Sequence, residues 1–220
     1  MDKSQLFEFY EILSLILPGS VMLYGLGKLF PQFMLFSTGS NFSAGEFGIF
    51  VIIAYAVGHI VQVFGGFVEF VWKHLRGDPM DWIQNGSKKP LIFDHQVEKL
   101  EAKIAKQLGM SSEEFKLKNL SRKEWSNMIK QMRIAVEIYG HTERLDKFQA
   151  IYMMCRGLIA ALFLLSLFSF FRTSPESWYL PYLLFGLAGI LFYRMARFEL
   201  NSVRELFIQF LQMQTSDKHN

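Results

Sequence analysis

Long apolar runs alternate with polar segments along the chain, and four of these runs are long enough to cross a membrane. A helix needs about 20 mostly apolar residues to span the hydrocarbon core of a bilayer. The four runs are Phe9 to Leu29, Phe47 to Trp72, Ile151 to Phe171 and Trp178 to Phe198. The second run is about 39 Å long as a helix and must therefore tilt or project from the membrane.

A water-soluble helical protein is the alternative interpretation of the same runs. A surface helix carries a polar face, whereas the stretch from Leu158 to Phe171 has no charged residue and is apolar all round. Aromatic residues mark both ends of the fourth run, with Trp178 and Tyr182 at one end and Tyr193 at the other, as is typical of membrane interfaces. The pattern predicts an all-α integral membrane protein built on a four-helix bundle.

Basic residues gather on one side of the predicted spans. The connection over residues 30–46 has no Lys or Arg, whereas such residues follow the second and fourth spans and precede the third. Because cytosolic loops carry the excess of Lys and Arg, both termini and residues 73–147 are expected in the cytosol. The expected location is the inner (plasma) membrane, with the chain crossing it several times.

This topology divides the chain into four parts. Residues 1–72 hold spans one and two, residues 73–147 form a small helical cytosolic insertion, residues 148–200 hold spans three and four, and residues 201–220 form a cytosolic amphipathic tail. In the insertion, the pattern predicts turns at residues 77–79 and 85–86, a helix from His95 to Leu108, and a second helix begun by a capping box at Ser121 to Glu124. A third helix is expected to run from near Thr142 into the third span.

Most of the charge lies in the insertion. It holds 26 of the 43 charged residues, as 15 Lys or Arg and 11 Asp or Glu, so its net charge is +4. This excess indicates contact with anionic membrane lipid or with an acidic partner. The charges are too evenly mixed to indicate direct nucleic-acid binding, and the single cysteine, Cys155, excludes a disulfide within the chain.

A polar stripe runs along one face of the second span. Its members are spaced by three or four residues and therefore share a helix face: Tyr55, His59, Gln62, Gly66, Glu69 and Lys73. Such a stripe must face protein or water, because acyl chains cannot solvate it. It can be a hydrogen-bonded seam between helices, a line of groups along a water-filled path or gate, or a metal or catalytic site at His59, for which no second ligand is evident.

A neighbouring face of the second span carries the small residues Ala54, Gly58 and Gly65. Small residues at this spacing let another helix approach closely, so we expect the chain to form homo-oligomers through this face. Gly186 and Gly189 of the fourth span are candidates for the matching surface. In the first span, Pro18 deprives the carbonyl of Ser14 of its helical hydrogen bond, which predicts a kink or a break.

One charge lies within a span rather than at its edge. Arg156 is five residues into the third span, about 8 Å deep, at a level similar to Glu69 of the second span and Glu11 of the first. The sequence therefore predicts a buried ion pair between Arg156 and either Glu69 or Glu11. The alternative is a belt of charges whose side chains reach up to the headgroups.

No catalytic motif is present, and no cofactor or metal is expected. The chain nevertheless resembles small four-span bacterial membrane proteins encoded among antiphage defence genes, such as the membrane subunit of the Kiwa system. The resemblance is carried by Tyr55-x-x-Gly58-His59-x-x-Gln62, Gly77-x-Pro79 and Tyr152-x-x-x-Arg156. It implies a membrane component that works with a separate cytosolic protein.

The expected function is that of a non-enzymatic membrane sensor or effector. It would oligomerise and couple a cytosolic signal or protein partner to the membrane, with a role in antiphage defence implied by the resemblance. The alternative is a channel or transporter subunit that uses the polar stripe of the second span. An enzyme at the membrane is the third possibility, and the sequence offers little for it.

Overall fold

The computed structural model describes residues 3–33, 43–86, 91–111, 115–139, 142–172 and 178–213. Every element in these ranges is a helix, which confirms the all-α prediction. The helices are α1 (Lys3–Leu29), η1 (Pro31–Phe33), α2 (Ala44–Arg76), α3 (Pro79–Asn85), α4 (Asp94–Leu108), η2 (Leu117–Asn119), α5 (Arg122–Tyr139), α6 (Glu143–Arg172) and α7 (Leu180–Gln212).

Three parts of the described chain are long and apolar enough to cross a membrane: Ile12–Leu29, Ala44–Asn85 and Glu143–Arg172. They indicate a membrane protein. The fourth expected span is the first half of α7, which is not among the three. The continuous helix α7 carries Arg194 and Arg197 after its apolar first half and then continues into the amphipathic tail.

The chain forms two compact units, which differ from the expected division. Unit 1 comprises residues 1–75 and 149–198, and unit 2 comprises residues 76–148 and 199–220. Over its described residues, 201–213, the predicted tail is therefore not a separate part, because these residues fold with the insertion. Both α6 and α7 run unbroken from one unit into the other.

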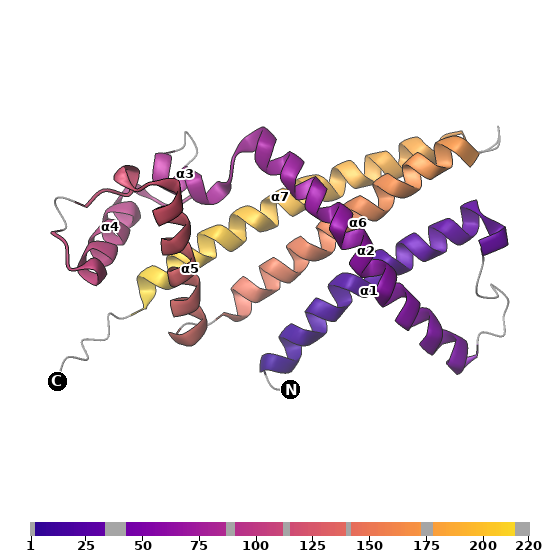
Figure 1. Cartoon of the computed structure of the whole chain (residues 1–220), viewed down its shortest axis with the longest axis horizontal. Helices are drawn as coiled ribbons and strands as arrows, with labels where there is room; N and C mark the ends of the chain where they lie inside the picture. The colour runs from indigo at the N-terminus through magenta and orange to yellow at the C-terminus, as the bar shows by residue number, and fades with distance from the viewer. Residues whose placement is uncertain are drawn as a thin grey trace. The chain divides into compact units, whose positions relative to one another are not determined.

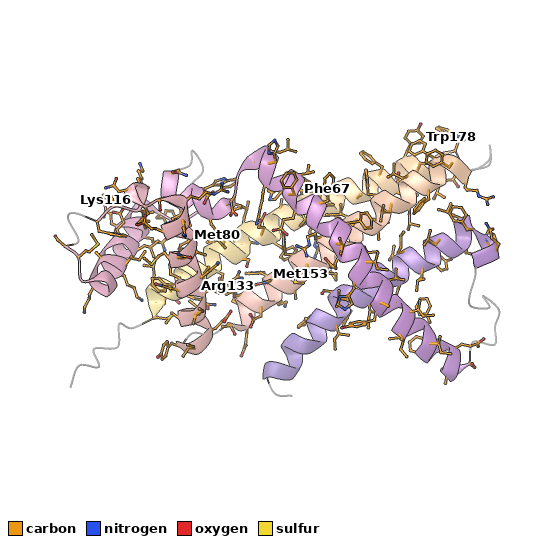
Figure 2. The ribbon with its side chains drawn as sticks, in the orientation of Figure 1. Phe67, Met80, Lys116, Arg133, Met153 and Trp178 are labelled. Atoms are coloured by element: carbon orange, nitrogen blue, oxygen red, sulfur yellow. The ribbon has the colours of Figure 1, made fainter. Side chains whose placement is uncertain are left out.

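Four helices build unit 1. α1 and α2 cross each other, and α6 lies beside α7 (Figure 1). One apolar cluster joins α1, α2 and α6 through residues such as Met22, Val61 and Ala161. A second joins α2, α6 and α7 through Trp72, Cys155 and Met195, among others. Exposed aromatic side chains lie on this unit, such as Phe67 on α2 and Trp178 just before the start of α7 (Figure 2).

The crossing of α1 and α2 depends on two glycines. A Cβ atom at Gly19 would overlap the backbone carbonyl of Ala54, and one at Gly58 would overlap the backbone carbonyl of Leu15. Any side chain at either glycine would therefore push the two backbones apart. Ala54 and Gly58 thus serve close packing within the chain.

The tail completes the core of unit 2. Its apolar face, which includes Val203, Leu206, Phe207 and Phe210, is buried with residues of α4 and α5. The rings of Trp125 and Phe207 stack with centroids 6.0 Å apart and planes 11° apart. A segment of about 75 residues is short of apolar surface for a stable core, and α7 supplies more.

Local signals set the helix ends of unit 2. In the predicted capping box, the Glu124 amide donates to Ser121 Oγ at 3.3 Å and the Ser121 amide donates to Glu124 Oε2 at 2.8 Å. The predicted turns at residues 77–79 and 85–86 are the two ends of α3, a short helix that the sequence analysis missed. The Asp78 side chain caps the start of α3, and Pro79 is its first residue. Gly86 ends the helix in the left-handed conformation, with φ 69°.

Candidate functional site

Gln62 joins three helices of unit 1 at one point. Its side-chain nitrogen donates to the backbone carbonyl of Ser14 on α1 at 3.3 Å and to that of Met153 on α6 at 3.0 Å. Its side-chain oxygen accepts from the Nε and Nη2 atoms of Arg156, also on α6, at 3.3 and 3.2 Å. We call the group formed by Ser14, Gln62, Glu69, Met153 and Arg156 the polar junction.

The carbonyl of Ser14 needs this partner because of Pro18. Proline has no amide hydrogen, so the carbonyl four residues earlier has no donor within the helix. A backbone oxygen without a hydrogen-bond partner in the hydrocarbon core of a membrane costs several kcal/mol of stability. Gln62 replaces the missing donor from a neighbouring helix, which lets the buried Pro18 remain inside a continuous α1.

Arg156 lies against Glu69. Its Nη1 atom donates to Glu69 Oε2, and the other oxygen of Glu69 pairs with Lys73 Nζ at 2.9 Å. The side chains of Arg156 and Glu69 are only 18% and 24% exposed. The Arg156 guanidinium also lies 5.9 Å from the ring centroid of Tyr152. Of the two expected acidic partners, the structure places Glu69 at Arg156, and the side chain of Glu11 lies outside the described residues.

Glycines make room for the polar junction. A Cβ atom at Gly157 would lie 2.7 Å from both Gln62 Nε2 and Pro18 Cγ. One at Gly65 would lie 3.1 Å from Arg156 Cγ and 3.3 Å from Gln62 Oε1. The sequence analysis assigned Gly65 to helix packing and missed Gly157. The available signal was a glycine directly after Arg156, the arginine predicted to need a buried partner.

The small-residue face expected to meet another subunit is used inside the chain. Ala54 and Gly58 meet α1, and Gly65 meets Arg156. Within the described chain, the expected counterparts Gly186 and Gly189 do not meet this face, since a Cβ atom at either would have no described atom within 4 Å.

The polar stripe of α2 divides into two parts. Gln62 and Glu69 belong to the polar junction, whereas Tyr55 and His59 are exposed on the surface of unit 1. Their rings meet edge to face, with centroids 4.7 Å apart and planes 88° apart. Gly66, on the same stripe, has open space beside it. The periodicity correctly places these residues on one side of the helix, but neighbouring helices cover only half of them.

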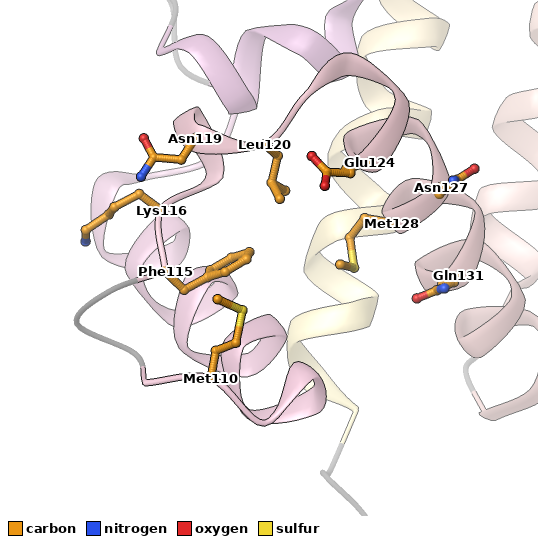
Figure 3. A pocket seen from close by; sticks show the side chains of 9 residues that line it. All are labelled: Met110, Phe115, Lys116, Asn119, Leu120, Glu124, Asn127, Met128 and Gln131. Atoms are coloured by element: carbon orange, nitrogen blue, oxygen red, sulfur yellow. The ribbon is translucent and has the colours of Figure 1, made fainter.

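Unit 2 has its own candidate site, a hollow of about 520 Å³ between α5 and the segment before it (Figure 3). Met110, Phe115, Leu120 and Met128 form its apolar lining, and Lys116, Asn119, Glu124, Asn127 and Gln131 its polar lining. The two charged groups already have partners. Lys116 pairs with Glu101 at 3.0 Å, and Glu124 accepts from Ser121. The apolar lining can take an apolar side chain, with Asn119, Asn127 and Gln131 as neutral polar groups around it.

A lysine of unit 2 holds the end of α7. Lys103 on α4 donates to the backbone carbonyls of Phe210 and Met213, the latter at 2.6 Å, and its ammonium lies 4.7 Å from the Phe210 ring centroid. Burial lowers the pKa of Lys103. The last carbonyls of a helix have no partner within the helix, so Lys103 satisfies two acceptors that α7 cannot. The sequence analysis did not identify this residue.

The described residues hold no group of three or more His, Cys, Asp or Glu side chains that could bind a metal ion. The polar junction combines the hydrogen bonds of Gln62 with the ion pair of Arg156 and Glu69. These interactions connect α1, α2 and α6. The chain was compared with protein-family models, with curated proteins and with solved structures, and no match was found. The resemblance to antiphage membrane proteins stays a prediction.

Proposed function

We propose that the chain is a non-enzymatic membrane sensor or effector that couples a cytosolic protein partner to the membrane. In this proposal it crosses the inner (plasma) membrane four times, with the first half of α7 as the fourth span. Unit 2 and both termini lie in the cytosol. The distribution of Lys and Arg along the sequence supports this orientation.

The observation that carries the proposal is the continuity of α6. Leu145 on this helix is buried in the core of unit 2, and Arg156, eleven residues later, belongs to the polar junction of unit 1. A continuous helix transmits a displacement along its axis, because its backbone hydrogen bonds resist stretching. A partner that moves unit 2 would thereby strain the hydrogen bonds of Gln62 and Arg156.

The cytosolic partner is proposed to insert an apolar side chain into the hollow of unit 2. The apolar lining of the hollow and the ion pair of Lys116 with Glu101 favour an apolar contact over recognition of an anionic ligand. Phage defence is the more specific form of the proposal and rests on the resemblance. Cells that carry this chain with its neighbouring gene should then resist phage, and cells that carry either gene alone should not.

Topology is the direct test. A reporter that is active only in the cytosol should work when fused after Asn220 or inserted into unit 2, and it should fail when inserted at Ser40. A cytosolic Ser40 would contradict the topology, and with it the proposed role of unit 2.

A channel or transporter subunit is the second candidate, favoured by the partial exposure of Glu69 and Lys73 at the polar junction. Ion flux through liposomes that contain the purified protein separates the two. Flux without any partner, abolished by Gln62→Leu, would favour the channel. Impermeable liposomes would favour the sensor.

A further inference from the structure

The exposed pair Tyr55 and His59 lies at the depth of the hydrocarbon core, according to two independent measures. At the crossing of α1 and α2, Gly58 lies against Leu15 and Ala54 lies against Gly19, and both α1 residues are within the apolar stretch Ile12–Leu29. His59 follows Gly58 directly. Measured along α2, His59 is 13 residues before Trp72, where the predicted span ends. This is about 20 Å of helix, which lies within the roughly 30 Å thickness of a bilayer core.

The two side chains have polar atoms that nothing in the described structure satisfies. They contact each other through their ring faces and edges, and neither the imidazole nor the phenol has a hydrogen-bond partner among the described residues. Acyl chains offer no hydrogen bonds, so polar groups facing lipid at this depth are costly. The adjoining exposed face of α2, with Ile60, Val63 and Phe67, is by contrast apolar and suited to lipid.

We propose that Tyr55 and His59 form the contact between two copies of this chain within the membrane. This inference rests on the membrane topology of the proposed function and assigns a face to the self-association expected from the sequence. A two-fold contact must be self-complementary. Neutral histidine and tyrosine each carry one donor and one acceptor, so His59 of one copy can bond Tyr55 of the other, and the reverse, which satisfies both pairs.

The surface around the pair permits close approach. Gly48 lies seven residues before Tyr55, and Gly66 lies seven residues after His59, which places both glycines on the side of α2 that carries the pair. A Cβ atom at either glycine would have no described atom within 4 Å. Small residues on both flanks let a second α2 come near enough for side-chain hydrogen bonds.

Cysteine cross-linking in native membranes tests the position of this contact. The background variant is Cys155→Ala, since the native thiol is buried and alone. Gly66→Cys and Ile52→Cys lie on the proposed face and leave the pair intact, while Ile60→Cys and Phe67→Cys are exposed controls on the lipid-suited face. Oxidation with copper phenanthroline should give a band at twice the chain mass for at least one of the first two and for neither control. Equal cross-linking at all four positions, or a band only with another protein, would overturn the proposal.

A second measurement tests the chemistry. Energy transfer between labelled copies in liposomes, at decreasing protein-to-lipid ratio, gives the dissociation constant. His59→Leu should raise it about tenfold, as expected for two interhelical hydrogen bonds, whereas His59→Gln should restore most of the affinity and Ile60→Leu should leave it unchanged. If His59 faces lipid, His59→Leu will leave association unchanged, and the proposal fails. Reporter topology is independent of these results, so a failed interface with a correct topology would leave the proposed function standing.

Discussion

The side-chain amide of Gln62 donates a hydrogen bond to the backbone carbonyl of Ser14, which lies 48 residues earlier on a different helix. Pro18 makes this bond necessary, because it removes the donor that the Ser14 carbonyl would otherwise have. One side chain thus compensates for a proline on α1 while it also holds α6 through Met153 and Arg156. Two of the three helices that are apolar enough to span a membrane, α1 and α6, meet the third, α2, at this residue.

The first prediction is that Gln62 and Pro18 are energetically coupled. Gln62→Leu should lower the free energy of unfolding by about 2 kcal/mol, because it removes the hydrogen bonds of Gln62 to the Ser14 and Met153 carbonyls and to the Arg156 guanidinium. Pro18→Ala restores an amide hydrogen to the Ser14 carbonyl. The double variant should therefore lose less stability than the sum of the single losses.

Thermal unfolding in detergent measures this cycle, and Ile60→Leu, an exposed substitution on the same helix, is the control. Strictly additive losses would mean that the Ser14 carbonyl does not depend on Gln62.

The elements of this fold are largely predictable from sequence, because their signals are local. The apolar runs predict the cores of the long helices, and the Ser121 to Glu124 pattern predicts the start of α5. Depth alone predicts that Arg156 has an acidic partner, Glu69 or Glu11, since an arginine inside a span needs an acid at its own level. The structure pairs it with Glu69. The short helix α3 was missed because its cap and its terminal glycine were both interpreted as turns.

The assembly of these elements is less predictable, because periodicity assigns residues to a face but does not name the helix that covers it. Gly58 and Gly65 have the spacing of an interface between subunits, and the same spacing serves a crossing within one chain. The tail of α7 is amphipathic in either context, and only the tertiary structure shows that Phe207 and Phe210 complete the core of unit 2. The participation of Gly157 depends on a contact with Gln62, which is 95 positions earlier in the sequence.

The second prediction concerns pH and the cap of α5. Hydrogen bonds from Ser121 lower the pKa of Glu124 below the usual 4.5. Because the folded pKa lies below the unfolded one, the stabilisation is fully present above pH 4.5 and is lost as the pH falls through the folded pKa. Ser121→Ala should return the Glu124 pKa toward 4.5 and make α5 less sensitive to acid.

A carbon-13 NMR titration of the Glu124 carboxyl group measures the shift, and Ser126→Ala, at an exposed serine of the same helix, is the control. An unchanged Glu124 pKa in Ser121→Ala would contradict the capping box as the cause.

The third prediction concerns Lys103 and the end of α7. Lys103→Met should free the carbonyls of Phe210 and Met213 and cost about 1 kcal/mol, because two acceptors at the helix end lose a charged donor. Amide hydrogen exchange should accelerate over the last two turns of α7 and remain unchanged in the first half of that helix. Lys103→Arg keeps a cation at this position and should preserve most of the protection. Lys106→Met, an exposed lysine on α4, is the matched control, and equal effects of Lys103→Met and Lys106→Met would show that the cap contributes nothing.

The last prediction concerns the charges at the polar junction. The Glu69 carboxylate forms ion pairs with two cations, Arg156 and Lys73, whereas Arg156 also donates hydrogen bonds to Gln62. Removing Glu69 therefore leaves two positive charges adjacent and without their anion, and removing Arg156 leaves Glu69 still paired with Lys73. Glu69→Gln should be the more damaging single change, by roughly 2 kcal/mol or more, and Arg156→Met the milder one. The double variant should be at least as stable as Glu69→Gln alone, because it removes the unpaired guanidinium as well.

Thermal unfolding in detergent and in lipid nanodiscs would measure all three variants, with Lys73→Met added to Glu69→Gln to test whether the second cation contributes. Additive losses for Arg156 and Glu69 in both media would show that the guanidinium reaches the headgroups and does not depend on the carboxylate.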